Sequence, residues 1–309
     1  MKKVSVLIPC FNEEKSLPLL YSELRKMADL LFNYEWEFLF INDGSIDGTI
    51  SVLKELRIHD DRCCYVDLSR NYGKEVAMLA GFDYVTGDAV IIMDADLQHP
   101  PQIIPEMIEK WENGYDDVYA KRLTRGKESW LRKKLSLKYY KMLSKHSRMD
   151  VLPNVGDFRL LDRRCVDALK QIREQCRYTK GMFCYIGFKK TSVYFETQDR
   201  VAGSSSMSYR NLFLLGLEGI MSYTITPLRI ASLIGGCMSL ISIMYCIFIL
   251  INTILHGDPV AGFPTLIVVV LFLGGIQLLC LGIIGEYLGR VYIESKNRPV
   301  YFIRSYNGD

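Results

Sequence analysis

The chain has 309 residues, 49% of them hydrophobic, and a formal net charge of +3. This apolar content and nearly balanced charge exclude an intrinsically disordered chain, and the length allows one sizeable globular domain with an appendage. Nine cysteines and four histidines are present, but their spacing predicts neither a disulfide framework nor a zinc site. We therefore expect reduced thiols, as in the cytosol.

The amino terminus lacks the pattern of a secretory signal. Residues 1–9 contain two lysines and a very short apolar run, and Glu13 and Glu14 follow almost at once. A signal peptide needs a longer apolar core and a small-residue cleavage site. We expect this part of the chain to stay in the cytoplasm.

Short β-rich runs then alternate with segments of helical length. We predict strands over 4–8, 38–41, 64–68 and 89–93. This rhythm predicts an α/β fold with a mostly parallel sheet, covered on both faces, whose ligands bind at the carboxyl ends of the strands. Unusual polar clusters occupy those positions, at 10–14, 42–47, 69–74 and 94–99.

The motif DADLQH at 94–99 directly follows the last of these strands. Mg²⁺ and Mn²⁺ take oxygen ligands and leave positions for substrate phosphates. Asp94, Asp96 and the amide oxygen of Gln98 could share one ion with a diphosphate, and the ion would neutralise charge on a departing nucleoside diphosphate. An isolated Asp-x-Asp pair is also common as a turn or a helix cap.

The cluster NDGSIDGT at 42–49 follows the second strand. One interpretation is a glycine-containing turn with a helix cap, in which Asp47 or Thr49 has no further role. A carboxylate at the end of a strand can also accept hydrogen bonds from a base or ribose, and Asp43 is the better candidate for that contact. The two interpretations are compatible.

Residues 121–148 form a strongly basic stretch with interleaved aromatic residues, including Arg122 and Arg125. The pattern indicates an amphipathic helix with its entry loop. A solvated basic face or a nucleic-acid site would show the same composition. Because the chain also has membrane segments, we favour an anionic bilayer surface and expect no nucleic-acid partner.

Two long stretches without charged residues, 230–255 and 263–284, are each long enough to span a bilayer. Buried soluble helices are the alternative, but two in succession predict a transmembrane hairpin. Lys and Arg flank the pair and are missing from the short connection, which predicts that both termini are cytoplasmic. We divide the chain into a catalytic domain (1–207), an interfacial amphipathic helix (208–228), a transmembrane hairpin (229–290) and a cytoplasmic tail (291–309).

Several motifs together resemble glycosyltransferase family 2, over nearly the whole chain. The motifs are IPCFNEE at 8–14, NDGSIDGT at 42–49, SRNYGK at 69–74, DADLQH at 94–99, KR at 121–122, GDFR at 156–159 and GEYLGR at 285–290. Within that family the chain is most similar to polyprenyl-phosphate glycosyltransferases, and the terminal hairpin resembles that of bactoprenol glucosyltransferases. The resemblance implies a glycosyltransferase A fold and inverting transfer from a nucleotide sugar, UDP-glucose being the favoured donor.

The resemblance also implies roles for individual residues. The nucleoside pocket would be lined by Pro9, Phe11, Asn12, Glu13 and Asp43. Lys74 would reach the donor, and Asp94, Asp96 and Gln98 would hold Mg²⁺ or Mn²⁺. The acceptor phosphate would meet Arg122, Arg125, Arg200 and Ser205. The family often has lysine where this chain has Ser206, which removes one expected phosphate contact unless Arg210 replaces it.

The predicted acceptor, undecaprenyl phosphate or a related polyprenyl phosphate, is an anion near neutral pH and can attack without first losing a proton. Positioning and cationic groups are then the main requirements. We expect Asp96 and Asp157 to be the catalytic carboxylates. Asp157 could orient Arg159 or another cation, accept a proton from a protonated phosphate, or form a structural salt bridge.

Two other functions fit parts of the sequence. A processive polysaccharide synthase would also have the metal motif and membrane helices, but none of the three tryptophans occurs in a Gln-x-x-Arg-Trp motif. A catalytically silent membrane scaffold would not need the intact carboxylates at 94 and 96. We also predict self-association, as a homotetramer, through small residues of the hairpin such as Gly235 and Gly274. The product would serve the modification of a cell-envelope glycan.

Overall fold

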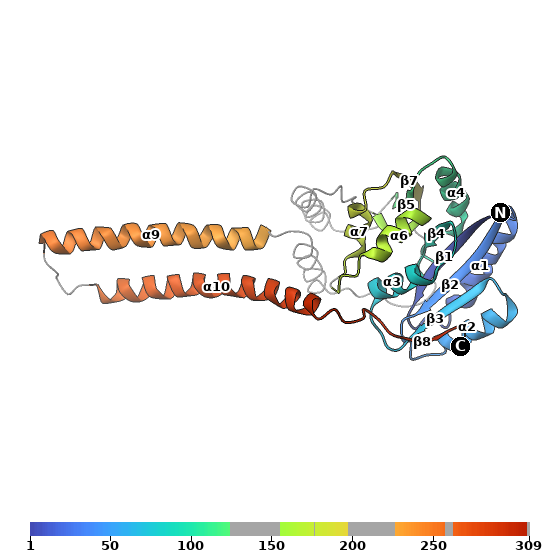
Figure 1. The fold of residues 1–309 in the computed structure, drawn as a ribbon, viewed down its shortest axis with the longest axis horizontal. Coiled ribbons are helices and arrows are strands. Elements are labelled where there is room, and N and C mark those ends of the chain that lie inside the picture. Colours follow the sequence, from blue (N-terminus) through green and yellow to red (C-terminus); the bar gives the residue numbers. More distant parts are fainter. Residues whose placement is uncertain (124–154, 176, 197–225, 257–261, 308–309) are drawn as a thin grey trace. The chain divides into compact units, whose positions relative to one another are not determined.

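The computed structural model describes residues 1–123, 155–175, 177–196, 226–256 and 262–307 (Figure 1). The chain divides into two compact units, of which the first comprises Met1–Gly216 together with Pro299–Asp309 and the second Leu217–Arg298. The basic segment beyond residue 123, the interfacial segment 208–225 and the hairpin connection at 257–261 lie outside the described residues.

Four neighbouring strands form the parallel part of the sheet in the first unit. They are β1 (Lys2–Cys10), β2 (Tyr34–Asn42), β3 (Cys63–Leu68) and β4 (Ala89–Ile92). All four predicted strands are confirmed, and β1 and β2 begin earlier than expected. Because parallel strands end at the same edge, the polar clusters that follow them gather there.

The other strands make the sheet mixed. They are β5 (Asp117–Arg122), β6 (Val155–Asp162), β7 (Lys190–Phe195) and β8 (Ile303–Tyr306). The order is β7-β5-β6-β4-β1-β2-β3-β8, in which β6 runs antiparallel to β4 and β5, and β8 runs antiparallel to β3. The segment that follows the membrane hairpin, treated above as a separate tail, therefore contributes an edge strand to the sheet.

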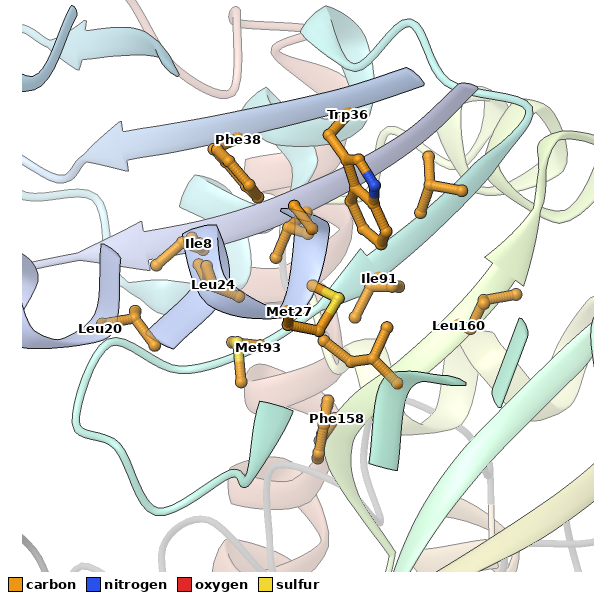
Figure 2. Close-up of a cluster of buried hydrophobic side chains, with 14 of the residues drawn as sticks. Ile8, Leu20, Leu24, Met27, Trp36, Phe38, Ile91, Met93, Phe158 and Leu160 are labelled. Carbon is orange, nitrogen blue, oxygen red and sulfur yellow. The ribbon is translucent and has the colours of Figure 1, made fainter. Parts of the chain in front are cut away.

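Helices cover both faces of the sheet, as predicted. The structure describes here α1 (Leu17–Leu30), α2 (Thr49–His59), α3 (Lys74–Tyr84), the 3₁₀ turn η1 (Pro101–Ile103), α4 (Ile104–Glu112), α6 (Arg163–Gln171) and α7 (Thr179–Tyr185). Side chains alternate along β1, so Val6 and Ile8 face the core formed with α1 and α4, whereas Leu7 faces the core formed with α3, α6 and α7. Figure 2 shows the first of these cores, where Leu24 and Met27 of α1 lie against side chains of the sheet.

The second unit contains α9 (Thr226–His256) and α10 (Phe263–Ser295), which lie side by side as an antiparallel pair (Figure 1). Both are long and apolar enough to cross a membrane, and they contain the predicted spans. Large apolar side chains such as Leu233 and Leu278 are 68% and 71% exposed. Apolar surface of this extent needs lipid or another protein to cover it, so the helices suggest membrane anchoring.

Candidate active site

Side-chain hydrogen bonds join the loop after β1 to the loop after β2. Asn12 adopts a left-handed backbone conformation with φ of 58°. Its backbone N–H donates to Ser45 Oγ at 2.9 Å, and its side-chain oxygen accepts from the Ile46 N–H at 3.0 Å. The Glu14 carboxylate accepts from the Gly48 N–H at 3.1 Å. Asn12, which was predicted to line the nucleoside pocket, thus holds the two loops together.

Asp47 bonds the first turn of α2, although the N-cap residue is Gly48, and its carboxylate also accepts from the backbone N–H of Glu14 at 3.3 Å. Asp47 Oδ1 accepts a hydrogen bond of 3.0 Å from the backbone N–H of Thr49, the first residue of α2. The Thr49 hydroxyl in turn accepts from the backbone N–H of Glu13 at 2.9 Å. Of the other two residues predicted to line the nucleoside pocket here, Pro9 lies within β1 and Phe11 lies just beyond it. The Phe11 side chain is 45% exposed, so its ring is accessible to a ligand.

Asp43 fixes the loop that follows β3. It is only 3% exposed, and its two carboxylate oxygens accept from the backbone N–H groups of Tyr72 at 2.7 Å and Gly73 at 2.9 Å. Burial raises the pKa of Asp43, although the two backbone hydrogen bonds oppose this shift. The contact with a base or ribose stays a prediction. The structure adds a second role, because Asp43 determines where the chain enters α3.

Lys74, the first residue of α3, links two carboxylates from separate strand ends. Its Nζ lies 2.5 Å from Oδ1 of Asp94 and 2.7 Å from Oδ2 of Asp157. Burial would lower the Lys74 pKa, but the charges of Asp157 and Asp94 outweigh it and raise the pKa above its usual value. Residues predicted separately for donor, metal and catalysis therefore meet at one place.

The DADLQH loop is a tight turn stabilised from within. The backbone N–H of Asp94 donates to His99 Nδ1 at 3.1 Å, and that of Gln98 donates to Asp96 Oδ1 at 3.1 Å. Leu97 has a φ of 61°, in the left-handed region. His99 is 2% exposed and stacks on Phe158 with ring centroids 4.7 Å apart. Because Nδ1 accepts the hydrogen bond from Asp94, it carries no proton, and burial lowers the His99 pKa, which favours the neutral ring. No pattern in the sequence predicted this role of His99.

The donor set of this loop fits a hard divalent cation. No group of three or more His, Cys, Asp or Glu side chains that could hold a metal exists among the described residues. Mg²⁺ is commonly held by only one or two carboxylates plus substrate phosphates. Asp94 and Asp96 meet that requirement, with the Gln98 amide oxygen as a further neutral donor. They would hold the ion in company with a bound diphosphate.

Asp157 is ionised in this site. Burial opposes its ionisation, but Lys74, Lys180 and Arg159 outweigh the cost and lower the pKa to about 2. A carboxylate with such a low pKa is a weak base, which favours the orienting role over proton transfer. Its partner is Lys74, whereas the Arg159 guanidinium pairs with the fully buried Asp117 at 3.0 Å.

Of the predicted acceptor-phosphate residues, only Arg122 belongs to the described part of the chain. It is the last residue of β5, and its charge contributes to lowering the pKa of His99, which places it near the DADLQH loop. Arg125, Arg200 and Ser205 lie outside the described residues, as do Ser206 and Arg210.

Sequence reasoning missed two residues close to Asp157. Glu75 accepts a hydrogen bond of 2.8 Å from the backbone N–H of Thr179, and its pKa is raised by burial and by the charge of Asp157. Lys180 acts on Asp157 through its charge. Glu75 and Lys180 come close to Asp157 because α7 packs beside α3. No local sequence pattern predicts this packing.

Comparison with known proteins agrees with this architecture. Residues 5–169 match Glycosyl transferase family 2, and residues 226–291 match the GtrB C-terminal hairpin. The putative glycosyltransferase CsbB of Bacillus subtilis (strain 168) is 45% identical over 98% of this chain and 92% of its own length. A bactoprenol glucosyl transferase of Shigella phage SfX is 43% identical over 98% of this chain and 99% of its own length.

Two solved structures share the fold of the first unit. Mannosyl-3-phosphoglycerate synthase from Rubrobacter xylanophilus has a TM-score of 0.51 and 16% identity, over 71% of this chain and 72% of that one. Glucosyl-3-phosphoglycerate synthase from Mycobacterium tuberculosis, in complex with Mg²⁺ and UDP, has a TM-score of 0.50 and 16% identity, over 71% and 77% of the two chains. Together with the family matches they confirm the predicted glycosyltransferase A fold with its helical hairpin: the chain belongs to glycosyl transferase family 2 and carries the GtrB C-terminal hairpin.

Proposed function

We propose that this chain transfers glucose from UDP-glucose to a polyprenyl phosphate, with inversion at the anomeric carbon. The observation that carries the proposal is the meeting of Lys74, Asp94 and Asp157 at one sheet edge, in a chain similar over nearly its whole length to a bactoprenol glucosyl transferase. The similarity to this transferase supports polyprenyl phosphate as the acceptor and glucose as the sugar. The charged side chains at the sheet edge support a transfer between two phosphate-bearing substrates.

The reaction needs anions to approach each other. A phosphate oxygen of the acceptor attacks the anomeric carbon, the bond from that carbon to the UDP oxygen breaks, and its electron pair leaves with UDP. When bound at Asp94, Asp96 and Gln98, Mg²⁺ or Mn²⁺ supplies positive charge that stabilises the departing diphosphate. Lys74 lies beside that position and presents a cation to the donor.

Asp157 orients Lys74 and does not have to take a proton. The acceptor phosphate already carries negative charge near neutral pH, so a strong base is unnecessary. By accepting from Nζ at 2.7 Å, Asp157 fixes the ammonium between the two carboxylates. Arg122, with Arg125, Arg200 and Ser205, binds the acceptor phosphate in this proposal.

The membrane places the lipid acceptor within reach. The two apolar helices span the cytoplasmic membrane, with the catalytic unit and both termini in the cytoplasm, because Arg290, Lys296 and Arg298 follow the second apolar stretch. The glycolipid product serves the modification of a cell-envelope glycan. The homotetramer stays a prediction.

The test is transfer of radiolabelled sugar from UDP-glucose into an organic-extractable undecaprenyl-phosphate product, with Mn²⁺ or Mg²⁺ and with EDTA. We expect a metal-dependent product that Asp96→Ala abolishes. Asp61→Ala, at an exposed carboxylate in the turn before β3, is the matched control and should keep activity. Formation of a long polymer would favour a processive synthase. Nucleotide binding without transfer from any UDP- or GDP-sugar would favour the scaffold.

A further inference from the structure

The edge strand β8 comes directly after the membrane hairpin in the chain. Only residues 296–298 separate the end of α10 at Ser295 from Pro299, where the chain rejoins the first unit. β8 then pairs with β3 in antiparallel register, Val66 opposite Tyr306 and Asp67 opposite Ser305. The carboxy-terminal segment is thus part of the sheet whose strand ends form the site.

The register places Arg304 in a β-bulge. Asp67 lies opposite Ser305, but the next residue, Leu68, lies opposite Ile303, so Arg304 is the extra residue. Bulges bend a strand and change the direction of a side chain. Here the Arg304 side chain reaches Asp67, where Nη1 lies 3.2 Å from Oδ2, and its Nη2 donates to the carbonyl of Ser69 at 3.0 Å.

Asp67 connects Arg304 to the loop after β2. Its side chain is 4% exposed, and a buried carboxylate needs partners for both oxygens. Oδ1 accepts from Asn42 Nδ2 at 2.7 Å, and Asn42 Oδ1 accepts from the Ser45 N–H at 3.3 Å. The Ser45 hydroxyl then accepts from Asn12 at 2.9 Å. The chain of contacts ends in the loop after β1.

The same segment also holds the loop after β3. The backbone N–H of Ser69 donates to the Phe302 carbonyl at 2.9 Å, so both backbone polar groups of Ser69 are bound by the carboxy-terminal segment. At its other end this loop is held by Asp43 through Tyr72 and Gly73. Lys74 follows immediately, so the position of the loop determines where α3 and its lysine begin.

We propose that Arg304 is a positioning residue for the nucleotide site, which the segment after the membrane hairpin completes. Arg304 keeps the loops after β1, β2 and β3 in their mutual arrangement through Asp67 and Ser69, without touching the nucleotide. The inference rests on the proposed function, since it assumes that these loops bind the UDP part of the donor.

The test uses the full chain in detergent, with UDP binding measured by calorimetry in Mn²⁺, thermal stability measured on the same samples, and transfer kinetics. Arg304→Ala should raise the UDP Kd and the KM for UDP-glucose about two- to fivefold, the effect of losing an ion pair whose arginine is 61% exposed to solvent. The kcat should stay within about twofold, because the reacting groups are intact. Arg25→Ala, at an exposed arginine of α1 whose ion pair with Asp29 is 3.9 Å long, should change none of these values.

A double-mutant cycle tests the route through Asp67. Asp67→Asn and Arg304→Ala should each weaken UDP binding, and together they should weaken it by less than the product of the single effects, because both break the same contact. If Arg304→Ala does not fold, UDP binding is measured on Arg304→Lys instead. This variant should also bind UDP more weakly, since one ammonium cannot reproduce the two contacts of the guanidinium with Asp67 and Ser69.

An unchanged UDP Kd in Arg304→Ala or Arg304→Lys, or multiplicative losses in the cycle, would overturn the inference and leave the proposed function intact. A lower melting temperature with unchanged UDP binding would assign Arg304 a structural role only. Failure of the unmodified chain to bind UDP would overturn the proposed function itself, and the inference with it.

Discussion

Lys74 and Asp157 form an ion pair, Nζ to Oδ2 2.7 Å, that joins the start of α3 to β6. The Asp157 side chain is 11% exposed, whereas that of Lys74 is 40% exposed. One end of the pair is therefore fixed in the fold and the other is open to a ligand. Asp94 on the same ammonium, at 2.5 Å, connects the pair to the proposed metal loop.

Replacing Lys74 should disable transfer. Lys74→Ala removes the cation beside the donor and leaves Asp94 and Asp157 without it, so we expect kcat to fall by roughly 10²–10³, as for other lost electrostatic groups. Lys74→Arg keeps the charge and should retain part of the activity. The measurement is steady-state glucosyl transfer, and Lys26→Ala, an exposed lysine on α1 paired with Glu23, serves as control. Near-normal turnover in Lys74→Ala would contradict the assignment.

Asp157→Asn tests whether this residue orients a cation or takes a proton. The neutral amide holds Lys74 less firmly, so kcat should fall about 100-fold, the usual cost of misplaced reacting groups, with UDP affinity retained. Asp167→Asn, at an exposed carboxylate of α6, should be neutral.

The pH profile distinguishes the two roles of Asp157. Its pKa is lowered to about 2, below the ordinary value, so the carboxylate is fully ionised above about pH 4. An acid limb of wild-type kcat at higher pH must come from another group and should persist in Asp157→Asn. Disappearance of that limb in the variant would indicate proton transfer by Asp157.

Metal dependence should follow the carboxylates of the DADLQH loop. EDTA should abolish transfer and added Mn²⁺ should restore it. Loss of a group that only supports a metal ligand typically weakens metal binding about 10–100-fold, and loss of a direct ligand should cost at least as much. Asp96→Asn should therefore raise the Mn²⁺ concentration for half-maximal activity at least tenfold. Direct Mn²⁺ binding by electron paramagnetic resonance, in the presence of UDP, gives a readout independent of turnover. Asp61→Asn is the control, and equal Mn²⁺ affinity in both variants would rule out Asp96 as a ligand.

Comparing Gly44→Ala with Gly114→Ala should separate the cost of backbone strain from the effect of displacing the loop after β3. Gly44 has a φ of 64°, and a Cβ there would lie 2.3 Å from the backbone carbon of Arg70, in the loop held by Asp43. Gly114 has a φ of 85° with nothing within 4 Å of a Cβ. Each alanine should cost about 1 kcal/mol or more from strain at positive φ, and only Gly44→Ala should also weaken UDP binding. Thermal unfolding and UDP calorimetry measure the two effects, and equal UDP affinity in both variants would refute the displacement.

Local sequence pattern was sufficient for the elements that are regular along the chain. Buried apolar runs such as the one in β1 predicted the parallel strands, and two uncharged stretches predicted the helices α9 and α10. The strands β5, β6, β7 and β8 were not predicted. β8 has only four residues and follows a turn after α10, and its stabilising contacts with β3 come from far away in the chain, where periodicity carries no information.

The candidate site divides in the same way. The sequence by itself determined which side chains follow the strand ends, because strand and turn chemistry are local, and it therefore predicted Asp43, Lys74, Asp94 and Asp96 at one edge of the sheet. Only the tertiary structure decided their partners: Lys74 with Asp157, Asp43 with the loop before α3, and Asp67 with Arg304 of the carboxy-terminal strand. These pairings depend on strand order and on the antiparallel pairing of β6 with β4 and of β8 with β3, since hydrogen bonds and ion pairs require atoms within a few ångströms in space whatever their separation in sequence.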